Sequence, residues 1–315
     1  MDVSMTQESI NKVGILGGGL IGASWASLIS AFGYDTVVYD PRVETGPAMQ
    51  AFVRDAWVHL RALHPALREP FIAPHFTTNV ADLETVDFVQ ENGPDRIDVK
   101  MDIVSQLEKV VRDDVVIATS TSSLLASDIQ AGASHPERIL VAHPMNPPHL
   151  VPMVELVAGR ATDPEVISRA EVFYRDLERV TVRVKKEVVG HLANRLTSAL
   201  YREAVHIAAE GIADVADIDR AIIYGPGLRW ALTGPHLTYH LGGGKGGYRH
   251  YLDHLGPTQE ARWREHGTSA LTEAVKDLLV EGVERELSAQ DRDTLVERRD
   301  AALVDILKIK RSKGF

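Results

Sequence analysis

Two ionisable residues, His143 and Glu155, lie in stretches of sequence that otherwise predict buried β-structure. His143 ends the run "RILVAHP", and Glu155 interrupts the apolar run from 151 to 157. A buried carboxylate is costly to desolvate unless it has a partner, and the proline-rich bend "MNPPHL" would let the chain turn back to supply one. A lone histidine or glutamate also has plainer explanations, as a structural hydrogen-bonder or as the partner of an arginine. The proposed pair would do proton chemistry, because a histidine side chain titrates near neutral pH.

A glycine-rich turn near the N-terminus predicts a dinucleotide site. "VGILGGGLIGASWASLISAFGYDTVVYD" reads as a strand, a turn, a helix and a second strand that ends in an acid. Gly17, Gly19 and Gly22 give the G-x-G-x-x-G spacing, in which the glycines permit the tight turn, the approach of the pyrophosphate and close helix–strand packing. The start of the helix would offer N–H groups to the phosphates. The alternative is a turn that binds no cofactor.

The acid at the end of the second strand, Asp40, favours NAD as the cofactor. Its carboxylate would accept hydrogen bonds from the adenosine ribose and would repel the 2′-phosphate of NADP. Arg42 is the one feature that favours NADP instead. Leu20 and Ile21, inside the glycine motif, complete the expected cofactor-binding set.

Two further polar segments could contribute to a site. "ATSTSSL" (118–124) follows an expected strand and contains Ser122, although such hydroxyl clusters are usually helix caps. "GHLANRL" (190–196) contains Asn194, which could equally be an ordinary polar residue of a helix.

Strand-like runs alternate with helix-like stretches over the first part of the chain, which predicts βαβ units and a mostly parallel sheet. The expected helices cover 20–32, 44–63, 97–111 and 164–179. The expected strands are "KVGILG", "DTVVYD", "VDFVQEN", "DVVIATS", "RILVAHP", "VPMVELV" and "VTVRVKK". After Gly190 only helical spacing is found, in 191–211, 214–223 and 268–310. We therefore expect an α/β fold with a Rossmann-type, doubly wound domain (1–188) followed by an all-helical domain (189–315).

Composition excludes several classes of protein. The 315 residues carry a net charge of −10, which argues against a nucleic-acid surface. The absence of cysteine removes disulfides and Cys-ligated metals, and no histidine spacing matches a metal motif, so no metal is expected. No apolar run is long enough to span a membrane and the start does not read as a signal peptide, so we expect a cytoplasmic protein.

Taken together, the ordered segments "GGGLIG", "YD", "QEN", "TSTSSL", "HPMNPPHLVPMVELV" and "GHLANRL" resemble the motifs of the 3-hydroxyacyl-CoA dehydrogenase superfamily. The resemblance covers roughly residues 12–255. It implies an NAD-dependent dehydrogenase in which Ser122, His143, Glu155 and Asn194 surround the reacting carbinol, while Glu91 approaches the nicotinamide side of the cofactor. It also implies a homodimer formed through the helical domain.

The resemblance further implies how these residues would act. His143 would take the proton of the 3-hydroxyl during hydride transfer, and Glu155 would fix the ring tautomer. Ser122 and Asn194 would bond the substrate oxygen.

Two departures from the acyl-CoA enzymes favour a small free 3-hydroxy acid as the substrate. The stretch 41–85 is short and has no lysine, and the expanded segment "GLRWALTGPHLTYHLGGGKGG" resembles the carnitine dehydrogenases and, more distantly, the gulonate dehydrogenases related to lambda-crystallin. In this segment Arg229 could pair with a substrate carboxylate, and Trp230 and Tyr239 could face a quaternary ammonium. Each of the three could instead be a core or interface residue.

The first substrate to test is therefore L-carnitine. L-gulonate or another 3-hydroxy acid comes next, and a short-chain 3-hydroxyacyl-CoA after that. A non-enzymatic, NAD(H)-binding structural protein is the alternative from another class, and the presence of both His143 and Glu155 argues against it.

Overall fold

The computed structural model describes residues 10–67, 69–288 and 290–315. The chain forms two compact units that meet between Arg195 and Leu196, a few residues after the boundary expected from the sequence. Each unit is described by itself below. Over the residues described, no helix has both the length and the apolar character needed to cross a membrane.

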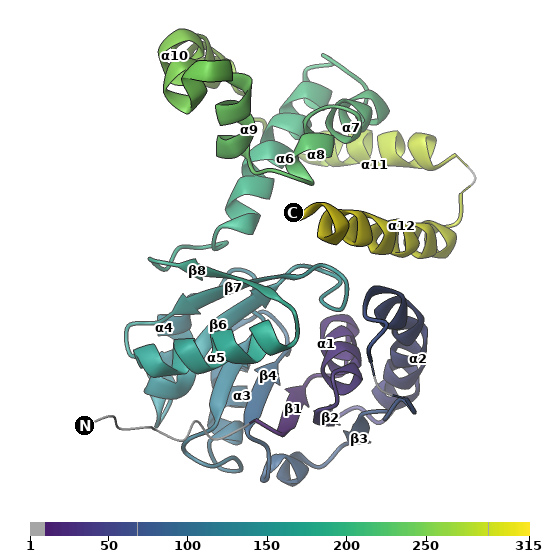
Figure 1. Cartoon of the computed structure of the whole chain (residues 1–315), viewed down its shortest axis with the longest axis vertical. Helices are drawn as coiled ribbons and strands as arrows, with labels where there is room; N and C mark the ends of the chain where they lie inside the picture. The colour runs from purple at the N-terminus through teal and green to yellow at the C-terminus, as the bar shows by residue number, and fades with distance from the viewer. Residues whose placement is uncertain (1–9, 68, 289) are drawn as a thin grey trace. The chain divides into compact units, whose positions relative to one another are not determined.

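The first unit is built on an eight-stranded sheet with the strand order β3-β2-β1-β4-β5-β6-β7-β8 (Figure 1). Its strands are β1 (Lys12–Leu16), β2 (Asp35–Tyr39), β3 (His75–Thr77), β4 (Phe88–Glu91), β5 (Val116–Thr119), β6 (Ile139–Pro144), β7 (Met153–Ala158) and β8 (Val180–Val184). All neighbouring strands are parallel except β6 and β7, which are antiparallel. The order from β3 to β6 is that of dinucleotide-binding folds, so the predicted Rossmann-type sheet is confirmed.

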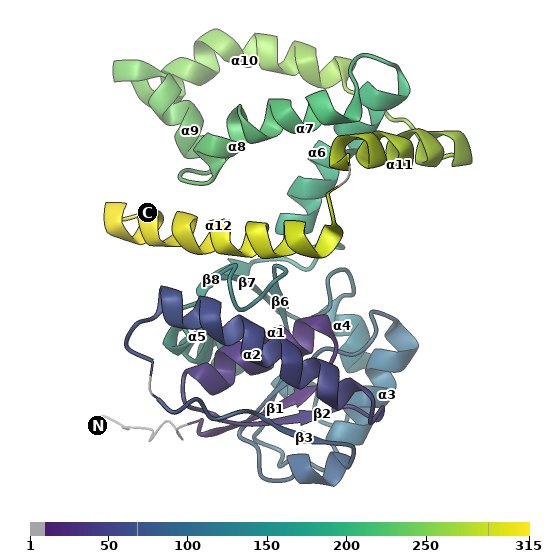
Figure 2. The same ribbon diagram turned by 90° about the vertical axis from the view of Figure 1, so that its right-hand side faces the viewer.

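Helices cover both faces of this sheet. On one face α1 (Leu20–Ala31), α2 (Thr45–Leu63) and α5 (Pro164–Asp176) share a single apolar core with the strands, and Figure 2 shows α2 lying alongside α1. On the other face α3 (Ile97–Leu107) and α4 (Ala126–Ile129) contribute to a second core. The fully buried side chains of these cores each stabilise the fold by about 1.5–3 kcal/mol.

The topology brings the ends of several strands to one edge of the sheet. β1, β4, β5 and β6 run in the same direction, and the segments that follow them therefore emerge at the same edge. The chain leaves β1 toward β2 on one side and reaches β4 on the other, which makes this edge the place where α/β sheets bind ligands.

In the described residues of the second unit, all regular secondary structure is helical. α6 (Ala193–Ala209) begins in the first unit and continues into the second. The remaining helices are α7 (Val215–Ile223), α8 (Pro226–Trp230), α9 (Pro235–Gly242), α10 (Gly247–Glu265), α11 (Glu273–Leu287) and α12 (Arg292–Lys313). The helical spacing found in the sequence over 268–310 corresponds to two helices, α11 and α12.

Candidate active site

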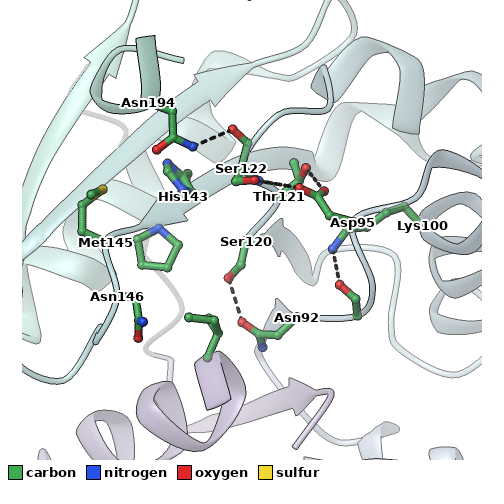
Figure 3. Close-up of a pocket in the computed structure, with 13 residues that line it drawn as sticks. Asn92, Asp95, Lys100, Ser120, Thr121, Ser122, His143, Met145, Asn146 and Asn194 are labelled. Atoms are coloured by element: carbon green, nitrogen blue, oxygen red, sulfur yellow. Dashed lines mark hydrogen bonds between the residues drawn. The ribbon is translucent and has the colours of Figure 1, made fainter. Parts of the chain in front are cut away.

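A cavity of about 380 Å³ opens at the carboxyl edge of the sheet in the first unit, within the range of small-molecule sites. Its lining comes from the segments after β1, β4, β5 and β6 and from the first turn of α6 (Figure 3). The lining residues are Ile21, Asn92, Gly93, Asp95, Lys100, Ser120, Thr121, Ser122, His143, Pro144, Met145, Asn146 and Asn194.

The glycine turn between β1 and α1 has the geometry that a dinucleotide needs. Gly17 has φ +90°, in the left-handed region, and a Cβ at Gly22 would lie 1.8 Å from the carbonyl oxygen of Gly17. A Cβ at Gly19 would meet nothing within 4 Å, and no side chain caps the start of α1 there. The unpaired N–H groups of the helix start are therefore open to an anionic group, which fits the pyrophosphate of NAD.

Asp40 lies at the end of β2, directly beside this turn. Its Oδ2 accepts a hydrogen bond from the Gly18 N–H at 3.0 Å, and Arg42 donates to both carboxylate oxygens at 3.0 Å. Burial raises the pKa of the Asp40 carboxyl, but the hydrogen bonds from Arg42 and Gly18 outweigh it and hold the pKa below its usual value. The Arg42 side chain is thus bound to the carboxylate that would contact the ribose.

His143 and Glu155 face each other across the antiparallel strands β6 and β7, as register partners. Nδ1 of His143 lies 2.7 Å from Oε2 of Glu155, and both side chains are almost fully buried. Because an ionised carboxylate only accepts hydrogen bonds, Nδ1 must carry the proton. In the neutral ring with this tautomer, Nε2 of His143 carries a lone pair, which is the form that a general base requires.

The other oxygen of Glu155 is held by the start of α6. Oε1 accepts hydrogen bonds from the N–H groups of Leu192 at 2.7 Å and Ala193 at 2.9 Å. Burial raises the pKa of the Glu155 carboxyl, while the bonds from His143, Ala193 and Leu192 outweigh burial and lower the pKa overall. The carboxylate is therefore ionised at neutral pH and has a partner on each oxygen.

Ser122 and Asn194 lie together at the same pocket (Figure 3). Nδ2 of Asn194 donates to the carbonyl oxygen of Ser122 at 3.2 Å. The Ser122 hydroxyl donates to Oδ2 of Asp95 at 2.8 Å, and the Ser122 N–H donates to the same oxygen at 3.1 Å. Thr121 also donates its hydroxyl to Asp95, so this acid organises the serine loop.

Glu91 lies below the lining of the pocket and is 1% exposed. Its carboxylate binds Nζ of Lys100 at 2.7 Å and the hydroxyl of Thr119 at 2.6 Å. It is Lys100 that reaches the pocket lining, so the expected approach of Glu91 to the cofactor stays a prediction.

Two further histidines, His191 and His149, are buried and hydrogen-bonded outside the pocket lining. His191 is fully buried, its Nε2 donates to the carbonyl oxygen of Thr121 at 3.1 Å, and its ring centroid lies 5.4 Å from that of His143. Burial lowers the pKa of His191, which favours a neutral ring beside His143. His149 belongs to the bend between β6 and β7, and its backbone N–H and Nδ1 both bond the hydroxyl of Ser24 in α1.

Sequence reasoning missed several lining residues, namely Asn92, Asp95, Lys100, Ser120 and Asn146. A signal for most of them exists, because Asn92 and Asp95 follow β4 as Ser120 follows β5, at the strand ends where ligands bind. Asn146 lies in the bend whose course the sequence does not define.

The three candidate substrate residues belong to the second unit. Arg229 and Trp230 end α8, and Tyr239 lies in α9 with its ring stacked on Tyr251 at 4.4 Å between centroids. All three side chains are exposed. Their role in substrate binding stays a prediction.

Comparison with known proteins agrees with this arrangement. The family model for the NAD binding domain of 3-hydroxyacyl-CoA dehydrogenase matches residues 12–188, and the model for the C-terminal domain matches 190–276. The chain belongs to the 3-hydroxyacyl-CoA dehydrogenase family. It is therefore an NAD-dependent oxidoreductase that acts on a CH–OH group.

Several curated relatives extend over nearly the whole chain. L-carnitine dehydrogenase of Pseudomonas aeruginosa is 40% identical, over 97% of this chain and 97% of its own length. L-carnitine dehydrogenase of Nocardiopsis dassonvillei is 36% identical, over 96% of this chain and 92% of its own. A similar solved structure is an NAD⁺-dependent dismutase, 5-formyl-3-hydroxy-2-methylpyridine 4-carboxylic acid 5-dehydrogenase. It has a TM-score of 0.84 and 26% identity, and the match covers 96% of this chain and 99% of that one.

Proposed function

We propose that this protein is an L-carnitine 3-dehydrogenase, which oxidises the 3-hydroxyl of L-carnitine to the ketone with NAD. The reaction type rests on one observation, the buried His143–Glu155 pair at the edge of a pocket beside the glycine turn. The choice of substrate is supported by the relatives named L-carnitine dehydrogenase, which align with almost the full chain.

In this proposal His143 is the general base. Its Nε2 takes the proton of the substrate hydroxyl, and NAD, when bound, accepts the hydride from the carbinol carbon. As charge develops on the ring, the ionised Glu155 stabilises the imidazolium and keeps Nδ1 protonated. In the reverse direction the protonated His143 returns its proton to the substrate oxygen.

Ser122 and Asn194 orient the substrate oxygen at the base. The Ser122 hydroxyl donates to Asp95 in this structure and can rotate to donate to the oxygen of a bound substrate instead. The single proton of the substrate alcohol goes to Nε2 of His143, so Ser122 would act as a hydrogen-bond donor to the substrate oxygen. Asn194, bonded to the same loop, places its amide next to Ser122.

The glycines Gly17, Gly19 and Gly22 and the adjoining Leu20 and Ile21 would hold the cofactor phosphates, and Asp40 its adenosine ribose. The pairing of Arg42 with Asp40 supports NAD over NADP, because the arginine is already matched by a carboxylate. In the second unit, Arg229 would bind the substrate carboxylate, and Trp230 and Tyr239 the trimethylammonium group.

The proposed assembly is a homodimer formed through the helical unit. Large apolar side chains of this unit are exposed, such as Tyr224 at 76%, Leu196 at 66% and Trp263 at 60%. Apolar surface of this kind marks association sites when it is contiguous. The cytoplasmic location expected from the sequence also stays a prediction.

The experiment compares NADH formation with L-carnitine, L-gulonate, 3-hydroxybutyrate and 3-hydroxybutyryl-CoA under the same conditions. We expect the highest kcat/KM with L-carnitine. A preference for the CoA thioester or for L-gulonate would refute the substrate assignment while leaving the reaction type in place.

A further inference from the structure

The acidic and basic side chains that line the pocket differ in their ion pairing. The pocket lining contains one acidic and one basic side chain that are not histidines, Asp95 and Lys100. Lys100 is 2% exposed, and its Nζ lies 2.7 Å from Glu91 and 3.0 Å from the carbonyl oxygen of Gly93. The charge of Lys100 is thus balanced by the carboxylate of Glu91, which does not itself line the pocket.

The hydrogen-bond partners of Asp95 are all neutral groups. Its oxygens accept from the hydroxyl of Thr121 and from the hydroxyl and N–H of Ser122. The neighbouring Arg96 pairs with Asp98 instead. Within the described ranges, Asp95 forms no salt bridge, and Lys100 acts on it only through space, so its negative charge can still attract a cation that enters the pocket.

The hydrogen bonds also keep this carboxyl ionised. Burial raises the pKa of Asp95, but the bonds from Thr121 and Ser122 outweigh it, and Lys100 adds to them through space, so the pKa lies below its usual value. Asp95 is therefore anionic over the whole neutral range.

We propose that Asp95 is a specificity-determining residue, which supplies the negative charge opposite the quaternary ammonium of the substrate. This inference rests on the proposed function, because it deepens the choice of substrate at the same site. A trimethylammonium group donates no hydrogen bonds, so a site can recognise it only through its charge and its methyl groups. A carboxylate whose hydrogen bonds are already satisfied by neutral groups suits such a cation.

The position of Asp95 agrees with the structure of the substrate. Oδ2 of Asp95 lies 2.8 Å from Oγ of Ser122, the group proposed to bond the substrate oxygen. In L-carnitine the ammonium nitrogen is only two bonds of about 1.5 Å each from the carbinol carbon. The carboxylate carbon is also two bonds from the carbinol carbon, so a substrate bound at Ser122 brings one of its two charged ends close to Asp95, and the charge of Asp95 favours the cationic end. The same charge would disfavour substrates whose tails are anionic.

The test compares L-carnitine with 3-hydroxy-5,5-dimethylhexanoate, in which a neutral carbon replaces the ammonium nitrogen and the shape is kept. For the wild-type protein we expect kcat/KM to favour L-carnitine. In Asp95→Asn, which can still accept a bond from Ser122, we expect that preference to fall about tenfold, as for the loss of one partly solvated charge pair. Asp95→Glu should retain most of it.

Asp98→Asn is the matched control, because Asp98 lies on the same segment, is exposed and does not line the pocket. It should leave the preference unchanged. Equal losses with both substrates in Asp95→Asn would overturn the proposal, since Asp95 would then only position Ser122. A loss of NAD⁺ affinity that accounts for the whole effect would also overturn it, since Asp95 would then serve the cofactor.

A binding measurement separates this inference from the proposed function. The NADH-loaded protein is titrated with 4-(trimethylammonio)butanoate and with its neutral analogue 5,5-dimethylhexanoate, neither of which can be oxidised at C3. Tighter binding of the cation that is lost in Asp95→Asn supports the inference even if L-carnitine is not turned over. Equal binding of the two ligands by the wild-type protein refutes it.

Discussion

Glu155→Gln is a change of one atom that should remove most of the turnover. In the structure Oε1 of Glu155 accepts from two backbone N–H groups and Oε2 accepts from Nδ1 of His143. A glutamine must turn its NH2 group toward one of these sets of donors. Facing His143 is the less costly choice, because the ring can change tautomer whereas the N–H groups of Leu192 and Ala193 cannot.

The change of tautomer determines the size of the effect. With the glutamine NH2 donating to Nδ1, the proton of His143 moves to Nε2, which can then no longer accept the substrate proton. An equivalent change in serine proteases lowers kcat by about 10⁴-fold while the geometry is kept. We expect a loss of kcat of about 10³ to 10⁴-fold in Glu155→Gln, or about 4–5.5 kcal/mol of transition-state stabilisation.

The assay measures kcat from NADH formation and the dissociation constant of NADH from its fluorescence, for the wild type and the variant. Glu171→Gln is the control, because Glu171 pairs with Arg183 at the surface of the same unit. It should behave as the wild type, and both variants should bind NADH normally. A Glu155→Gln protein that folds, binds NADH and retains kcat within about tenfold of the wild type would refute the orienting role of Glu155.

Three more outcomes follow from the geometry. Asp40→Asn should weaken NADH binding about tenfold and reduce the preference for NADH over NADPH, because the ribose loses its hydrogen-bond acceptor and Arg42 loses its ion-pair partner. Fluorescence titration with both cofactors measures this, and an unchanged selectivity would contradict it. Gly22→Ala should abolish folding or NADH binding, because its Cβ would collide with the carbonyl oxygen of Gly17. Circular dichroism and NADH titration check this, and a variant that folds and binds NADH as the wild type does would contradict the close contact between Gly22 and Gly17. Glu155 has a lowered pKa, so its stabilisation is complete above the unfolded value of about 4.3 and lost as the pH falls through the folded value. The difference in unfolding free energy between wild type and Glu155→Gln, from urea titrations, should therefore shrink with acidification below about pH 4, and a difference independent of pH would contradict the assignment.

The sequence predicted the sheet and the His143–Glu155 pair for a physical reason. Runs of β-branched residues that alternate with helical spacing have few other solutions than a doubly wound sheet. An acid within a buried strand needs a partner, and the proline-rich bend made His143 the nearest one. That the two residues are exact register partners could not be predicted, because the register depends on how the bend closes.

The rest of the site depends on contacts between residues far apart in the sequence. Asp95 meets Ser122 only because β4 and β5 are neighbours, and His191 meets Thr121 only because α6 starts behind the serine loop. In the helical unit, α8 and α9 were missed because each opens with a proline within a glycine-rich segment, which resembles a loop. Proline in the first turn is compatible with a helix, but the sequence around it carries little periodicity.

The central claim, that His143 is the base of a carnitine-oxidising site, is tested most directly by His143→Ala. The measurement is kcat/KM for L-carnitine in the wild type and the variant, together with the dissociation constant of NADH for both. We predict that the wild type oxidises L-carnitine, that the variant loses about 10² to 10⁴-fold in kcat/KM, and that NADH binds equally well to both. Turnover of L-carnitine by His143→Ala at a rate near that of the wild type would contradict the role of His143 as the base.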